Sequence, residues 1–174
     1  MRIAIAASVL FFGLSISTSQ LAYAEDTTVS RQHIEQIIDT FKNTIINKDT
    51  AGFMRLFLRD NITWTGVYTD GSVERYNASL KDPNEPRGPK VENTGPRRFI
   101  ENIAKAKEVR SETFSNVRID TDGDMAQVWF DYTFMVGDYK NNWGKESWQL
   151  VRTENGWKIA AVVYSVEENP IPRR

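Results

Sequence analysis

The segment from Met125 to Val136 constrains the fold of this chain more than any other feature. Its even-numbered positions are all apolar or aromatic: Ala126, Val128, Phe130, Tyr132, Phe134 and Val136. Its odd-numbered positions are mixed, with Gln127 and Asp131 beside Trp129. Successive side chains of a strand point to opposite faces, so this alternation predicts a long β-strand with one face buried against a core.

Three further segments are rich in strand-forming residues and are separated by turn signals: 112–119, 143–152 and 157–166. The turn before the last of them contains Asn155-Gly156, a typical hairpin signal. Consecutive strands joined by tight turns pair antiparallel, so the second half of the chain predicts an antiparallel meander.

The first half of the chain predicts helices. From Ser30, which can cap a helix, apolar residues recur at helical spacing: Ile34, Ile37, Ile38, Phe41 and Ile45. A shorter helix is expected at 50–58, a strand at 61–66, and a third helix from Pro96. Helices segregated from an antiparallel meander make an α+β domain.

Between these elements, the segment from Thr69 to Gly95 is polar and is interrupted by proline and glycine. This pattern predicts a long loop without secondary structure of its own. Such loops are either functional lids or locally disordered, and the sequence leaves both alternatives open. The tail at 167–174, which contains Pro170 and Pro172, is expected to be loose.

Residues 1–24 have the layout of a secretory signal peptide. Arg2 precedes an apolar run that ends at Ile16, and Ala22-Tyr23-Ala24 puts small residues at the two positions that signal peptidase reads. The run is shorter than the roughly 20 apolar residues of a spanning helix, which favours cleavage over an uncleaved anchor. We therefore expect residues 25–174 to form one periplasmic or secreted domain without a membrane anchor.

Composition excludes several kinds of site. The chain has no cysteine and one histidine, His33, which leaves no thiol nucleophile and too few ligands for a metal site built on cysteine or histidine. The net charge of −1 at pH 7 argues against a nucleic-acid partner bound through bulk charge. No glycine-rich phosphate loop is present, and we expect neither a metal nor another cofactor.

Three short motifs follow one another in the chain: Phe53-Met54-Arg55-Leu56-Phe57, Asp60-Asn61-Ile62-Thr63-Trp64 and Gly156-Trp157-Lys158-Ile159-Ala160. With the order of elements, they resemble the nuclear transport factor 2-like superfamily, which includes SnoaL-like polyketide cyclases and ketosteroid isomerases. The resemblance covers residues 30–166. It implies a curved antiparallel sheet wrapped around the N-terminal helices, the cystatin-like cone, with an internal pocket. It also implies a homodimer formed through the outer face of the sheet.

The resemblance does not extend to the catalytic groups of the ketosteroid isomerases. Thr65 stands where it places their carboxylate base, and Trp148 stands where it places their oxyanion-binding acid. That chemistry needs both a base and a neutral acid. Glu146 is the acid nearest to the second position.

The candidate acid–base groups each have two interpretations. Glu146 shares a strand face with Trp148, where burial would raise the pKa of its carboxyl and suit it to act as a base; alternatively, it is a solvated residue at the strand's start. His33 is either a proton carrier or a surface residue at the edge of the helical stripe. Asp131 is either an acid in the cavity or a residue of the outer sheet face, and the apolar opposite face favours the second.

Aromatic residues form the larger set of candidates. Those expected nearest to a pocket are Trp64, Tyr68, Tyr132 and Trp148. Their flat rings and N–H and O–H groups suit a small, partly apolar ligand. Ordinary packing in the core or in a dimer interface is the alternative.

Three functions stay open. The favoured one is an exported protein that binds a small, partly apolar molecule in the cone, without assigned chemistry. The second is an enzyme of the SnoaL or ketosteroid isomerase kind, with Glu146 or His33 as base and Tyr132 or Tyr164 polarising a carbonyl oxygen. The third is a dimeric assembly module. The second function requires these polar groups to meet in one cavity.

Overall fold

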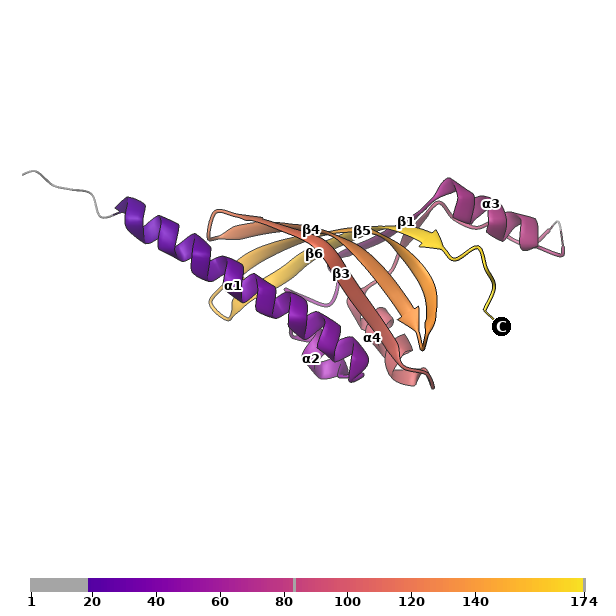
Figure 1. The fold of residues 1–174 in the computed structure, drawn as a ribbon, viewed down its shortest axis with the longest axis horizontal. Coiled ribbons are helices and arrows are strands. Elements are labelled where there is room, and N and C mark those ends of the chain that lie inside the picture. Colours follow the sequence, from indigo (N-terminus) through magenta and orange to yellow (C-terminus); the bar gives the residue numbers. More distant parts are fainter. Residues whose placement is uncertain (1–18, 83, 174) are drawn as a thin grey trace, which may run out of the picture.

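The computed structural model describes residues 19–82 and 84–173, and shows helices packed along a curved six-stranded sheet (Figure 1). The helices are α1 (Ser19–Ile46), α2 (Thr50–Met54), α3 (Asp70–Ser79) and α4 (Pro96–Lys105). The strands are β1 (Thr63–Tyr68), β2 (Val91–Asn93), β3 (Arg110–Thr121), β4 (Met125–Val136), β5 (Tyr139–Thr153) and β6 (Gly156–Glu168). Most of the predicted signal peptide, residues 1–18, lies outside the described part of the chain.

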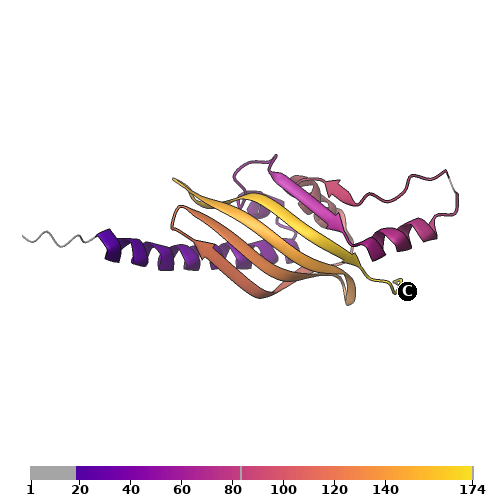
Figure 2. The same cartoon turned by 90° about the horizontal axis from the view of Figure 1, so that it is seen from above.

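The sheet confirms the predicted meander and adds one pairing. Its strand order is β2-β1-β6-β5-β4-β3, and β3 to β6 pair antiparallel in sequence order. β6 then pairs with β1 in parallel. Figures 1 and 2 show α1, α2 and α4 on one side of this sheet and α3 projecting beyond one end. The α+β prediction is therefore confirmed.

The core lies between the helices and the inner face of the sheet. On β4 the even-numbered residues Ala126, Val128, Phe130, Tyr132 and Val136 are all at most 4% exposed, as their alternation predicts. The helical stripe faces them: Phe41 on α1 packs against Trp148 on β5, with ring centroids 4.8 Å apart. Each fully buried side chain of this size stabilises the fold by roughly 1.5–3 kcal/mol.

Helix α1 begins earlier than predicted. Ser30 is not a cap but a residue of the helix interior, 2% exposed. No proline or glycine stands between residues 19 and 30, so the helix can continue on the N-terminal side of Ser30. No helix among the described residues is long and apolar enough to cross a membrane.

The prediction of a structureless loop from Thr69 to Gly95 was wrong, because this segment contains α3 and β2. Thr69 caps α3, and its hydroxyl accepts a hydrogen bond from the backbone N–H of Ser72 at 3.2 Å. The helix is polar and buries only one of its residues, Ser72, so it lacks the apolar period by which helices are recognised in a sequence.

The C-terminal tail is also held in place. Asn169 donates a backbone hydrogen bond to the carbonyl of Asn141 at 3.0 Å, and the hydroxyl of Tyr139 donates to the carbonyl of Ile171 at 2.8 Å. The tail therefore lies fixed beside the start of β5.

Gly144 permits a close approach of β5 to β6. A methyl group there would lie far inside the contact distance of the Ser165 carbonyl oxygen, which also accepts the hydrogen bond of the Tyr132 hydroxyl.

We expect Gly144→Ala to lower the free energy of unfolding by about 3 kcal/mol, because the backbone of Ser165 cannot turn away as a side chain can. Urea unfolding measures the change. Gly71→Ala is the control: its methyl group would meet only the tip of the Arg75 side chain, so a change within about 0.5 kcal/mol is expected. Unchanged stability of Gly144→Ala would contradict the close approach.

Candidate functional site

A cavity of about 190 Å³ lies between the inner face of the sheet and helices α1 and α4. Its wall is mainly aromatic: Phe41, Trp64, Phe99, Tyr132, Phe134 and Tyr164. Three carboxyl groups also line it, those of Glu112 on β3, Glu146 on β5 and Glu168 on β6. A mainly apolar wall with a few polar groups is typical of small-molecule sites.

Glu146 is buried on the inner face of β5, with 4% of its surface exposed. The indole N–H of Trp148, two residues along the same face, donates a hydrogen bond of 2.5 Å to its carboxylate. Burial raises the pKa of Glu146 to about 7, although the hydrogen bond from Trp148 acts in the opposite direction by stabilising the anion. Glu146 therefore exists in both protonation states near neutral pH.

Glu112 is a second buried acid, which the sequence analysis missed. It is 6% exposed, and no donor among the described residues bonds to its carboxyl group. Burial raises the pKa of Glu112 well above its ordinary value, and the charge of Glu146 raises it further. Glu112 thus holds its proton more tightly than an exposed glutamate does, and the two groups titrate as a coupled pair.

Tyr132 and Tyr164 add hydroxyl groups to the polar part of the cavity, which also includes Tyr68 and Asn142. The Tyr132 hydroxyl donates to the carbonyl of Ser165 at 2.9 Å, so its proton is already engaged. Tyr164 lies across from it, with ring centroids 6.2 Å apart. Burial raises the pKa of Tyr164 to about 12, and a hydrogen bond with Trp64 partly offsets this. Within the part of the chain that is described, no acceptor takes the Tyr164 proton, which leaves it for a ligand.

The remaining candidates are divided between the cavity and other sites. Trp64 and Tyr68 line the cavity, whereas Trp148 is fully buried beneath Glu146 and does not form the wall. His33 is exposed and borders a separate depression. The structure thus brings Glu146, Tyr132 and Tyr164 together without His33.

Asp131 lies on the outer face of the sheet, as the apolar opposite face predicts. It forms an ion pair with Lys145 and accepts a hydrogen bond from Asn116 at 2.6 Å. These two contacts, that of Lys145 first, lower the pKa of Asp131, so it stays ionised at neutral pH. It does not line the cavity. No group of three or more His, Asp or Glu side chains suited to a metal ion occurs within residues 19–82 and 84–173.

Comparison with known proteins establishes the fold. No family model matches the sequence, and no curated protein matches it. A similar solved structure is a nuclear transport factor 2-like protein with a cystatin-like fold from Novosphingobium aromaticivorans, with a TM-score of 0.61, 11% identity, and coverage of 87% of this chain and 91% of that one.

Two other solved structures show the same likeness. One, also from Novosphingobium aromaticivorans, is described as a candidate scytalone dehydratase. It has a TM-score of 0.58 and 17% identity, and the match covers 87% of this chain and 99% of that one. The other is a nuclear transport factor 2-like protein of unknown function from Pseudomonas putida. It has a TM-score of 0.56 and 11% identity, and the match covers 82% of this chain and 90% of that one. The chain therefore has the nuclear transport factor 2-like, cystatin-like fold, and the fold expected from its motifs is confirmed.

Proposed function

We propose that this protein binds a small, largely apolar ring compound in the cavity and moves a proton on it, with Glu146 as base and Glu112 as acid. The observation that carries this proposal is the pair of buried carboxyl groups with raised pKa in one aromatic cavity. A base with a pKa near the working pH is the most effective general catalyst. A carboxyl group kept neutral by an apolar site can donate a hydrogen bond to a developing oxyanion.

The reaction that uses both groups is proton transfer beside a carbonyl. Ionised Glu146 takes a proton from the carbon next to the carbonyl carbon. Protonated Glu112 and the Tyr164 hydroxyl donate hydrogen bonds to the carbonyl oxygen as it gains negative charge. Glu146 then returns the proton to the same carbon or to a conjugated one. The net reaction is an exchange or an isomerisation, and atoms and electrons balance without a further reactant.

The size of the cavity limits the ligand. A dry cavity of roughly 150 Å³ in a protein core accommodates benzene. The cavity of about 190 Å³ therefore suits one ring with a few substituents, and a fused-ring compound the size of a steroid exceeds it. The aromatic wall favours a flat ring.

Binding without chemistry is the alternative. It accounts for the aromatic wall but not for two carboxyl groups that must stay buried beside each other. Replacing buried ionisable groups with apolar residues is often neutral or stabilising, so a site for an apolar ligand alone gains nothing from the pair. The free-energy cost of keeping two carboxyl groups buried therefore favours a function in proton transfer.

We further propose that the protein works in the periplasm or outside the cell, and as a homodimer. The signal-peptide layout of residues 1–24 supports the location. The outer sheet face supports the dimer: Trp129 and Val163 are 37% and 42% exposed and lie in one cross-strand row, with Ser147 between them.

Deuterium exchange into simple ring ketones tests the proposed chemistry. The purified protein is incubated in D₂O with cyclohexanone, cyclohex-2-enone or acetophenone, and proton NMR follows the hydrogens next to the carbonyl. We expect exchange faster than in buffer for at least one ketone, because Glu146 equilibrates its proton with solvent. Saturation-transfer NMR on the same samples reports binding. Ketones that bind but exchange no faster than in buffer would show that the protein is a binding protein.

A further inference from the structure

A second cavity, of about 660 Å³, adjoins the first between α3 and the C-terminal segment. Tyr76 on α3, Pro89 before β2 and Pro170 in the tail contribute apolar surface to it. Tyr68 and Glu168 line both cavities, so the two spaces meet at these residues. A ligand with its ring in the inner cavity therefore has the Glu168 side chain as a neighbour at the boundary of the two cavities.

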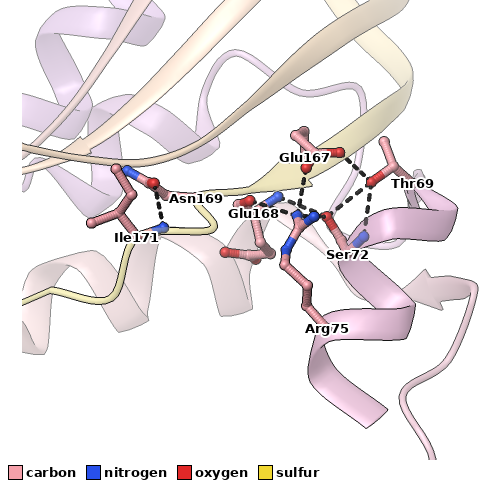
Figure 3. Close-up of polar contacts among 7 residues, drawn as sticks. All are labelled: Thr69, Ser72, Arg75, Glu167, Glu168, Asn169 and Ile171. Carbon is pink, nitrogen blue, oxygen red and sulfur yellow. Dashed lines mark hydrogen bonds and ion pairs between the residues drawn. The ribbon is translucent and has the colours of Figure 1, made fainter. Parts of the chain in front are cut away.

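Figure 3 shows that α3 is fastened to the end of β6, which gives the outer cavity a fixed wall. Arg75 forms an ion pair of 2.5 Å with Glu167 and donates to the backbone carbonyl of Glu168 at 2.9 Å. The Thr69 hydroxyl bonds to Glu167, and the Ser72 hydroxyl accepts the backbone N–H of Glu168 at 2.9 Å. These contacts engage only the backbone of Glu168 and leave its carboxylate to the cavities.

The charges around the junction are mostly negative. Glu92 lines the outer cavity and accepts a hydrogen bond from the Tyr68 hydroxyl at 3.0 Å. Arg75 is the only cation among the described residues that line either cavity, and Glu167 already pairs with it. No hydrogen bond to the Glu168 carboxylate is found within the described ranges; burial raises the pKa of Glu168, and the charge of nearby Arg75 offsets part of this. The junction thus disfavours anionic groups and leaves the Glu168 carboxylate without a hydrogen-bond donor among the described residues.

Glu112 gives independent evidence for a ligand. The residue is 6% exposed and lines the inner cavity, and no hydrogen bond to its carboxyl group is found among the described residues. A buried polar group without a protein partner is costly unless something else bonds to it. The two cavities therefore each present a carboxyl group to whatever occupies them.

We propose that the ligand carries a basic amine, whose ammonium group binds Glu168 at the junction while its ring occupies the inner cavity. This inference rests on the proposed function and narrows its substrate class to single-ring carbonyl compounds with a short aminoalkyl arm. The ammonium supplies the donor that Glu168 lacks, in a charge-assisted hydrogen bond. A carboxylate or phosphate at the same place meets like charges instead.

Three compounds with the same ring and the same two-carbon arm test this: 2-phenylethylamine, 2-phenylethanol and 3-phenylpropanoate. Isothermal titration calorimetry on the full purified protein at neutral pH measures their affinities. We expect the amine to bind about tenfold more tightly than the alcohol, and the carboxylate to bind most weakly.

Two variants that each remove one negative charge test whether Glu168 causes the preference for the amine. Glu168→Gln keeps the shape of the side chain and is expected to bring the affinities for amine and alcohol within about twofold of each other. Glu74→Gln removes the same charge from the exposed surface of α3, outside both cavities, and should keep the preference of the wild type.

Equal affinities in the wild type, a preference that survives in Glu168→Gln, or binding of none of the three compounds would each overturn the proposal. These outcomes are separate from the failure of the proposed function, because calorimetry measures binding and deuterium exchange measures proton transfer. A protein that prefers the amine but exchanges no deuterium would keep this inference and lose the chemistry.

Discussion

Glu146→Gln is expected to be more stable than the wild type above about pH 7, by up to roughly 3 kcal/mol. Burial raises the pKa of Glu146 from 4.5 to about 7 in the folded protein. Between these values the folded state binds more protons than the unfolded state, so the free energy of unfolding of the wild type falls as the pH rises. An amide has no proton to lose and no charge to desolvate, and its oxygen can still accept the hydrogen bond from Trp148.

Urea unfolding, followed by tryptophan fluorescence at about pH 5 and about pH 8, measures this difference. The gain in stability should be small at the lower pH and largest at the higher one. Glu154→Gln, at an exposed position in the hairpin between β5 and β6, is the matched control and should show no such dependence. If the wild type and Glu146→Gln lost stability in parallel over this range, Glu146 would not be a buried acid with a raised pKa.

The expected gain in stability indicates that the two buried carboxyl groups are retained for function. A residue that lowers stability at the pH where the protein works is retained when function needs it, and stabilising substitutions at such positions commonly cost activity. Glu112 strengthens this argument, because it too is buried with a raised pKa and lies in the same cavity. The buried positions of β4 on this face, by contrast, are all apolar or aromatic.

Local patterns predicted the elements whose signal lies within one segment. The alternation from Met125 to Val136 identified β4 and its buried face, because a period of two is visible in the sequence itself. The parallel pairing of β6 with β1 was not predictable in this way. It joins Thr63 to Ala161, and nothing in either segment specifies so distant a partner. Helix α3 was missed for the opposite reason: it is local, but it is polar on nearly every side.

The candidate site likewise contains residues that a local pattern identifies and residues whose meeting depends on long-range strand pairing. Glu146 was recognisable because it shares a strand face with Trp148 and Leu150. Glu112 was equally visible as the neighbour of Phe114 on one face, but its meeting with Glu146 depends on the registers of two strand pairs. His33 was plausible on chemical grounds alone, and the path of α1 places it away from the cavity.

The junction of the two cavities could not have been predicted from the sequence. Tyr68 and Glu168 lie a hundred positions apart and meet because the ends of β1 and β6 run in parallel, with Tyr68 opposite Val166. The outer cavity also needs α3, which the sequence did not reveal. Its residues come together only through the long-range pairing and the contacts of Arg75.

Glu146→Gln is also expected to lower the rate of deuterium exchange into a bound ring ketone by roughly a hundred- to ten-thousand-fold, the usual contribution of a general base. The amide keeps the shape of the side chain but cannot accept the proton. The rate of the wild type should rise with pH through about 7 as Glu146 ionises, and fall at higher pH as Glu112 loses the proton it donates.

The Glu112→Gln variant separates the role of Glu112 as hydrogen-bond donor from the role of Glu146 as base. Its amide still donates a hydrogen bond to the carbonyl oxygen, so the exchange rate at neutral pH is expected to stay within about tenfold of the wild type. Because the amide does not titrate, the fall in rate at high pH should disappear while the rise through about pH 7 remains. If Glu146→Gln exchanged deuterium as fast as the wild type, another group would be the base. A high-pH fall that persisted in Glu112→Gln would remove Glu112 from the reaction and leave Tyr164 as the remaining donor to the carbonyl oxygen.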